Sequence, residues 1–431
     1  DSVAEPAEVI PWRYLPEPCL VRIFEHLSLR DRIRAAGTCP EWLATSEHPL
    51  FWRRCFFKFV DESDAWLCTL PERYGRHFGG VQLAVDQGNQ RMRQLALSLL
   101  DLLGQFAVRL DSLSLRFVGA NPLFYSGKEF EDALVRLFNK LAELPDHVGL
   151  RRVDLSGAEL GIRDGLVLAL ASGHGRTLQC LSIMNGALVA QVSKETVMQL
   201  LDSCPRLEWL ELMNASFSER AMLYLAEHRR HSFRYLALHV SAETKQRLEH
   251  PWLPEVTWSR VSALMPQLRV SVTFDTRIPI RYVCRFLQPS LPLEELYLKT
   301  HTHLANEISY VARTFSRTLR RLCILASEQS ADLYAAFGLL AEKCGQQLEV
   351  LQVHCPLPRE VVHHLLDRCP RLLPIGRSVL RYPTADQDSQ EEIVYHSLGE
   401  LQAAAAAAAA AAGPVAELND YILDQVESSR S

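Results

Sequence analysis

The chain has 431 residues, of which 48% are hydrophobic and 23% charged, and its formal net charge at pH 7 is −5. These values are typical of a globular protein and exclude a collagen, a wholly disordered chain and a small disulfide-stapled scaffold. Because there is no basic excess and no apolar run of the ~18–20 residues that a membrane span needs, we expect neither a nucleic-acid nor a membrane partner.

Eleven cysteines, an odd number without clusters, are spread along the sequence. Many fall inside apolar patterns, where a free thiol behaves as a small buried hydrophobic side chain. This usage favours a reducing compartment, so we expect the protein to be cytoplasmic, nuclear or both.

Residues 1–11 are interpreted as a lead-in, and residues 12–57 as a small helical module. Its first helix carries four apolar residues on one face: Leu20, Ile23, Phe24 and Leu27. A second helix is predicted to begin at Asp31 and a third near Glu41. A bundle of about 45 residues has a marginal core, and its apolar residues cannot all point inward. This indicates a partner, a capping role on a neighbouring domain, or both.

The motifs of this module resemble the F-box family. The matching elements occur in order: Leu15-Pro16, Ile23-Phe24 with Leu27, Leu29 with Asp31-Arg32, Cys39 with Trp42, and Trp52-Arg53. Two features depart from the family: one residue fewer lies between Leu29 and Asp31, and Pro40, expected to shorten the second helix, precedes Trp42. The resemblance implies docking on a Skp adaptor through Leu15, Pro16, Leu20, Ile23, Phe24, Leu27, Leu29, Asp31, Arg32, Ala35, Trp42 and Trp52. For the aliphatic members, packing within the module is the open alternative.

Residues 58–109 are interpreted as linker helices and the start of the solenoid, and residues 110–381 as the repeat region. There a Leu-x-x-Leu-x-Leu pattern recurs, with first positions at 110, 150, 178, 207, 233, 268, 293, 319, 348 and 372. The six steps from 207 to 372 average 27.5 residues. The octapeptides starting at Leu200 and Leu365 are nearly identical. Amphipathic helical patterns fill the intervals, so strand–helix units that cannot bury their apolar faces alone are predicted to stack.

This pattern resembles the leucine-rich-repeat family in its longer strand–helix subtype. The resemblance implies an α/β solenoid with a curved parallel sheet, preceded by the all-α module. The Asn or Cys usual after the last strand leucine is missing at most repeats. An ordinary α/β domain with leucine-rich strands is the alternative.

An F-box followed by leucine-rich repeats resembles the substrate receptors of Skp–cullin–F-box ubiquitin ligases. The resemblance implies a Skp adaptor, cullin and RING subunits bound through it, and a protein substrate, with no catalytic residues. A scaffold or inhibitor in which the module only caps the repeats remains the alternative. No nucleophile elbow, phosphate-binding loop or zincin motif indicates an enzyme, and no zinc-like spacing indicates a metal. We therefore expect no cofactor.

Aromatic and basic residues between the strand leucines are candidates for substrate binding, because aromatic side chains anchor interfaces and arginines bind acidic or phosphorylated motifs. The set is Arg151, Arg152, Trp209, Tyr235, Tyr297, Arg320 and Arg321. A solvated face of mixed charge is the alternative.

Residues 382–431 change in character and are interpreted as a tail. Four carboxylates come first, followed by ten alanines at 403–412 and a short segment with apolar residues at helical spacing: Val415, Leu418 and Ile422.

Overall fold

The computed structural model describes residues 15–119, 127–158, 160–184, 192–240, 253–274, 280–301, 304–326, 330–372, 379–383 and 392–395. The chain divides into two compact units, Asp1–Leu210 and Glu211–Ser431, and each is described by itself. The predicted lead-in, the alanine tract and the amphipathic segment around Leu418 lie outside the described residues.

The first unit begins with three short helices, α1 (Glu17–Glu25), α2 (Leu29–Ala36) and α3 (Pro40–Ser46), and a 3-10 turn, η2 (Pro49–Trp52). Helix α2 begins two residues before the predicted start, because Ser28 caps it: the Ser28 hydroxyl accepts the N–H of Asp31 at 3.2 Å. Pro40 is the first residue of α3, where the missing N–H costs nothing.

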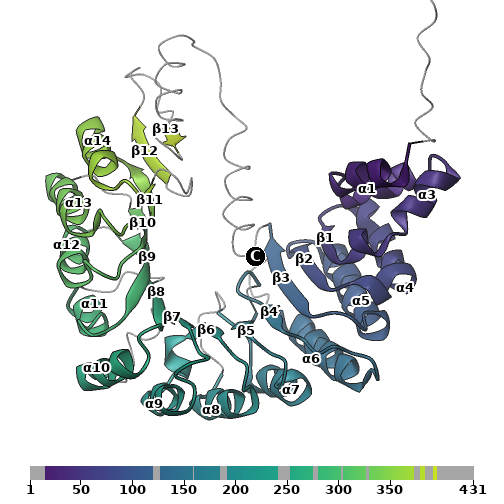
Figure 1. Cartoon of the computed structure of the whole chain (residues 1–431), viewed down its shortest axis with the longest axis horizontal. Coiled ribbons are helices and arrows are strands. Elements are labelled where there is room, and N and C mark those ends of the chain that lie inside the picture. The colour runs from purple at the N-terminus through teal and green to yellow at the C-terminus, as the bar shows by residue number, and fades with distance from the viewer. Residues whose placement is uncertain are drawn as a thin grey trace, which may run out of the picture. The chain divides into compact units, whose positions relative to one another are not determined.

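The rest of this unit alternates parallel strands with helices (Figure 1). The strands lie in chain order: β1 (Arg54–Phe59), β2 (Gly80–Asp86), β3 (Ser112–Val118), β4 (Arg152–Asp154) and β5 (Cys180–Ser182). The connections are η3 (Glu62–Thr69), α4 (Leu70–Tyr74), η4 (Gly75–His77), α5 (Gln90–Phe106), α6 (Lys128–Glu143), α7 (Asp164–His174) and α8 (Lys194–Ser203). The helices cover one face of the sheet, and the strand leucines are buried beneath them.

One backbone contact recurs at the start of each strand. The carbonyl of Arg53 accepts two successive N–H groups of the next repeat, those of Gly79 at 2.9 Å and Gly80 at 2.7 Å. The carbonyls of Gly79, Asp111, Arg151 and Gln179 accept in the same way from the strand that follows each of them. These bonds fix the register in which each strand joins its neighbour.

Two strands precede the repeat predicted at residue 110. They carry the repeat spacing with other residues in place of most leucines: Trp52, Cys55 and Phe57 at β1, and Phe78, Val81 and Leu83 at β2. All six side chains are buried. Only Leu83 among them is a leucine, so a leucine pattern does not detect these two strands. Strand β1 straddles the predicted boundary at residue 57, so the sheet begins directly behind the helices.

The second unit has the same alternation. After β6 (Trp209–Met213), which contains the division between the units, come the parallel strands β7 (Tyr235–Val240), β8 (Arg269–Phe274), β9 (Leu293–His301), β10 (Arg321–Ala326), β11 (Val350–Pro356) and β12 (Val379–Pro383). The helical elements are η5 (Asn214–Ser216), α9 (Glu219–His228), α10 (Glu255–Leu264), α11 (Ile280–Phe286), α12 (Ala305–Thr314), α13 (Ala331–Cys344) and α14 (Arg359–Arg368). Strand β13 (Glu392–Tyr395) pairs antiparallel with β12. The segment interpreted as a tail therefore contains strand residues.

The two near-identical octapeptides fold alike. Cys204 and Cys369 follow α8 and α14, and the N–H of each donates to the leucine carbonyl four residues earlier, at 2.9 Å in both places. Both thiols are fully buried, and burial raises the pKa of Cys369 to about 12. These cysteines therefore act as small apolar core residues. The predicted α/β class, helices followed by stacked strand–helix repeats, is confirmed.

We expect the first unit to lose stability on mild acidification through His174, which is 2% exposed. Its Nε2 contacts the Phe138 carbonyl at 3.0 Å, while its Nδ1 accepts the N–H of Leu150 at 3.4 Å. Burial lowers its pKa from 6.5 to about 4, so between these values the unfolded chain binds the proton better. This costs about 2 kcal/mol of stability between pH 7 and pH 5.

Thermal melting at the two pH values tests this, with His174→Gln as the variant that cannot titrate. The variant should melt lower than wild type at pH 7 but lose less on going to pH 5. An equal drop in both proteins would contradict the assignment.

Candidate binding surfaces

The N-terminal helical module has a core of its own. Phe24, with no exposed surface, contacts Trp42 and Phe51, each with ring centroids 5.7 Å from its own. Leu20 is buried as well. Trp52 is fully buried and stacks on Tyr74 of α4 at 3.7 Å. These three members of the predicted adaptor-binding set, Leu20, Phe24 and Trp52, thus hold the module together.

Two polar members of the set are also held by the module. Asp31 accepts the hydroxyl of Ser28 at 2.7 Å at the start of α2. Arg32 donates to the carbonyls of Phe51 at 2.6 Å and Leu27 at 3.2 Å, and its guanidinium lies 5.0 Å from the Phe51 ring centre. Partial burial lowers the pKa of Arg32. Arg32 therefore ties η2 to the end of α1.

The remaining members of the set stay at the surface. Pro16 is exposed, and the others are half-buried: Leu15, Ile23, Leu27, Leu29, Ala35 and Trp42. Sequence reasoning missed two more apolar side chains, Leu43 on α3 and Leu50 in η2, which are 39% and 46% exposed. The sequence contained a signal for them: the apolar residues near Trp42 and Trp52 are too many to fit into one small core. An apolar surface on short helices results.

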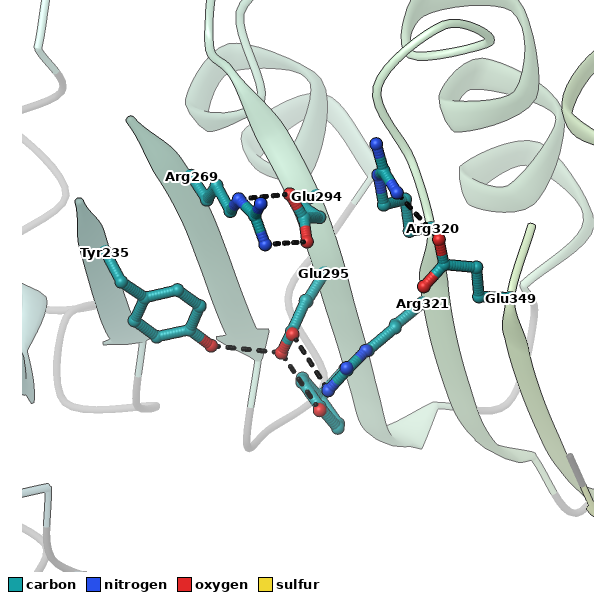
Figure 2. Close-up of polar contacts among 8 residues, drawn as sticks. Tyr235, Arg269, Glu294, Glu295, Arg320, Arg321 and Glu349 are labelled. Atoms are coloured by element: carbon teal, nitrogen blue, oxygen red, sulfur yellow. Dashed lines mark hydrogen bonds and ion pairs between the residues drawn. The ribbon is translucent and has the colours of Figure 1, made fainter. Parts of the chain in front are cut away.

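The strand face of the second unit, opposite the helices, carries the predicted site residues Tyr235, Arg320 and Arg321 (Figure 2). Glu295 of β9 is its centre: one carboxylate oxygen accepts the hydroxyls of Tyr235 at 3.0 Å and Tyr297 at 3.2 Å, and the other lies 3.2 Å from Arg321. Burial, followed by the neighbouring carboxylates, raises the pKa of Tyr235 well above its usual range. The structure brings Tyr235, Tyr297 and Arg321 together around a carboxylate that the sequence analysis did not single out.

The other arginines of Figure 2 are also paired across strands. Arg269 contacts both carboxylate oxygens of Glu294, at 3.4 and 3.3 Å, and Arg320 contacts Glu349 at 2.7 Å. Burial, despite nearby arginines, raises the pKa of Glu294. Each strand-face arginine drawn there already has a glutamate partner, so an external anion would compete with that partner.

The predicted arginines on the strand face of the first unit differ from the glutamate-paired arginines of the second unit. Arg151 and Arg152 are exposed at the start of β4, and within the described residues they form no ion pair. Arg152 lies beside Cys180 of β5, and the N–H of Trp209 donates to the carbonyl of Gln179 at 3.1 Å, which aligns Trp209 with the same row. Trp209 is 36% exposed.

None of the helices in the described part of the chain is long and apolar enough to cross a bilayer. Among the same residues, no three potential metal-ligating side chains come together.

Comparison with known proteins indicates the family to which the chain belongs. The F-box-like family model matches residues 12–58, which include α1, α2, α3 and most of β1. The chain is 30% identical to F-box/LRR-repeat protein 8 of Homo sapiens over 381 residues, 88% of this chain and 98% of that protein. It is 32% identical to the Bos taurus protein of the same name, with equal coverage. F-box/LRR-repeat protein 21 of Bos taurus is 22% identical over 278 residues.

An F-box-like helical module followed directly by leucine-rich strand–helix repeats defines an F-box protein, a class of adaptor and receptor subunits rather than enzymes. The chain belongs to the F-box/leucine-rich-repeat protein family. Its similarity to F-box/LRR-repeat protein 8 extends over nearly the whole of that protein.

Removing the carboxylate at the centre of Figure 2 should destabilise the second unit. Glu295→Ala leaves Arg321 and two tyrosine hydroxyls without their acceptor on a largely buried face, at a cost of about 2–4 kcal/mol. Glu295→Gln, which keeps an acceptor oxygen, should cost less. Urea unfolding measures both, and an alanine variant as stable as wild type would disprove the role of Glu295.

Proposed function

We propose that the chain is the substrate-recognition subunit of a Skp–cullin–F-box E3 ubiquitin ligase. Its helical module docks on the Skp adaptor, and through it on the cullin and RING subunits, while its repeats bind a protein substrate. The supporting observation is the F-box-like module, with an apolar surface left over, in front of a repeat sheet in a member of the F-box/leucine-rich-repeat family.

The adaptor-facing surface in this proposal consists of the apolar residues that the module leaves half-buried or exposed: Leu15, Pro16, Ile23, Leu27, Leu29, Ala35, Trp42, Leu43 and Leu50. Trp42 also packs against Phe24. Interfaces of this kind place apolar side chains at a desolvated centre with polar residues at the rim. Phe24, Trp52 and Arg32 contribute by holding the helices in position.

In this proposal the chain acts through proximity rather than through chemistry of its own. Holding a substrate and an adaptor on one folded chain raises the effective concentration of substrate lysines near the conjugating enzyme. Lysine modification itself belongs to the other subunits. A reducing cytoplasmic or nuclear environment fits this role, and the ten cysteines whose state the structure describes are free thiols.

One observation favours a second function, in which the module only caps the repeats of a scaffold or inhibitor. Trp52, the last residue of η2, occupies the first apolar position of the first repeat and stacks on Tyr74, so the module covers the end of that repeat. Capping and docking are compatible, and adaptor binding decides whether docking occurs.

Co-expression with the Skp adaptor followed by size-exclusion chromatography with light scattering tests the proposal. Wild type should elute as a complex of equal stoichiometry. The variant Leu15→Ala/Ile23→Ala/Leu27→Ala removes half-exposed side chains and should weaken the complex at least ~100-fold, as expected for truncations at an interface centre.

The matched control is Val148→Ala/Leu168→Ala/Val256→Ala, which truncates three exposed apolar side chains outside the module and should leave the complex unchanged. Circular dichroism melting establishes that both variants fold. A well-folded wild type that elutes alone would replace the receptor proposal with the capping function.

A further inference from the structure

The strand face of the first unit has a charge balance unlike that of the second. Alternate residues of β1 point away from the buried Cys55, Phe57 and Phe59, and three of them are Arg54, Phe56 and Lys58. We define the basic strand face as Arg54, Phe56, Lys58, Arg116 and Arg152. The acidic side chain within the same rows of β1–β4 is Asp154.

Strand register places these residues in rows. Arg54 aligns through Gly80 and Ser112 with Arg152. Three strand spacings, about 14 Å, separate the two arginines. Lys58 aligns through Ala84 with Arg116, about 10 Å away. Four cations therefore surround a central area of the sheet.

The row between Arg54 and Arg152 is filled by two small residues, Gly80 and Ser112. The next row holds Phe56, Gln82, Ser114 and Asp154. A Cβ added at Gly80 would meet nothing closer than 3.6 Å. An extended segment can thus approach the sheet along this row, between Arg54 and Arg152, without displacing bulky neighbours.

An apolar contact lies in the same area. Phe56 is 43% exposed, and the guanidinium carbon of Arg116 lies 5.4 Å from its ring centre. This cation–π contact holds the ring in place at the surface. A bound segment can therefore offer one apolar side chain to Phe56.

Three cations of this face differ from the glutamate-paired arginines of Figure 2. Arg54, Lys58 and Arg152 are exposed and form no ion pair or side-chain hydrogen bond within the described residues. Asp154 is occupied by Ser156, whose N–H and hydroxyl donate to it at 3.0 and 2.7 Å. Asp86, one step beyond Ala84 on β2, accepts the N–H of Gly88 at 2.9 Å.

We infer that the basic strand face binds an acidic protein segment that carries an apolar residue for Phe56. Charge complementarity identifies the occupant: the second-unit arginines drawn in Figure 2 are paired with glutamates, whereas this face presents three cations without an ion pair within the described residues. The binding of the segment to this face does not depend on the proposed function. The further statement that the segment is a substrate's recognition element does rest on it.

Fluorescence anisotropy on the full-length chain tests the inference with two labelled probes, a short polyglutamate peptide with a central leucine and the same peptide without it. Arg54→Glu/Lys58→Glu/Arg152→Glu should weaken both at least ~30-fold. The control Arg91→Glu/Arg176→Glu/Arg206→Glu changes the net charge equally at exposed arginines of the same unit and should bind as wild type does. Phe56→Ser should abolish the preference for the leucine-containing probe.

Four results would overturn the inference. Three are equal weakening by both triple variants, equal binding of single-stranded RNA, and no binding of the peptides to wild type. The fourth is tighter peptide binding when Asp386→Asn, Asp388→Asn and Glu391→Gln are combined, because the chain's own acidic segment would then be the occupant. Adaptor co-elution of the same variants separates the two proposals, because it should be unchanged even where peptide binding is lost.

Discussion

The double hydrogen bond that recurs at the start of strands β2–β6 and β11 is the contact on which the rest of the structure depends. A carbonyl such as that of Arg151 accepts the N–H groups of both Gln179 and Cys180, and the carbonyl of Arg320 accepts those of Glu349 and Val350 in the same way. With the strand entrance fixed, the apolar positions of one repeat must align with those of the next. This alignment stacks the leucines of successive repeats under the helices. Because side chains alternate between the two faces of a strand, it also decides which polar residues become neighbours on the other face.

This explains what could be predicted from the sequence. The spacing of leucines is a local property of each strand, so the strand–helix repeats from residue 110 onward follow from it. The solenoid was expected to start within residues 58–109, but β1 and β2 were not located individually. Trp52, Phe57 and Phe78 fill leucine positions equally well in space, and a leucine pattern does not match them. Burial depends on volume and shape, which several apolar residues share.

The binding surfaces were harder to predict, for a related reason. The sequence indicated Arg321 as a residue that could meet an acidic motif. Its neutralisation by Glu295 depends on which residue of β9 stands opposite it, and register comes from the folded sheet. Likewise, Phe24 and Ile23 are adjacent in one motif, yet only Phe24 is enclosed between Trp42 and Phe51. A motif identifies the module, and packing assigns its residues to the core or to the surface.

Trp52 makes the junction between the module and the repeats rigid. It is the last residue of η2, and at the same time the first apolar position of the first repeat. No spacer peptide therefore separates the helices from β1, and rotation between them would have to break the stacking on Tyr74. Within the first unit, the orientation of anything held on the strand face relative to anything held by the helices is set by side-chain packing. The torsional freedom that a flexible tether would allow is absent at this junction.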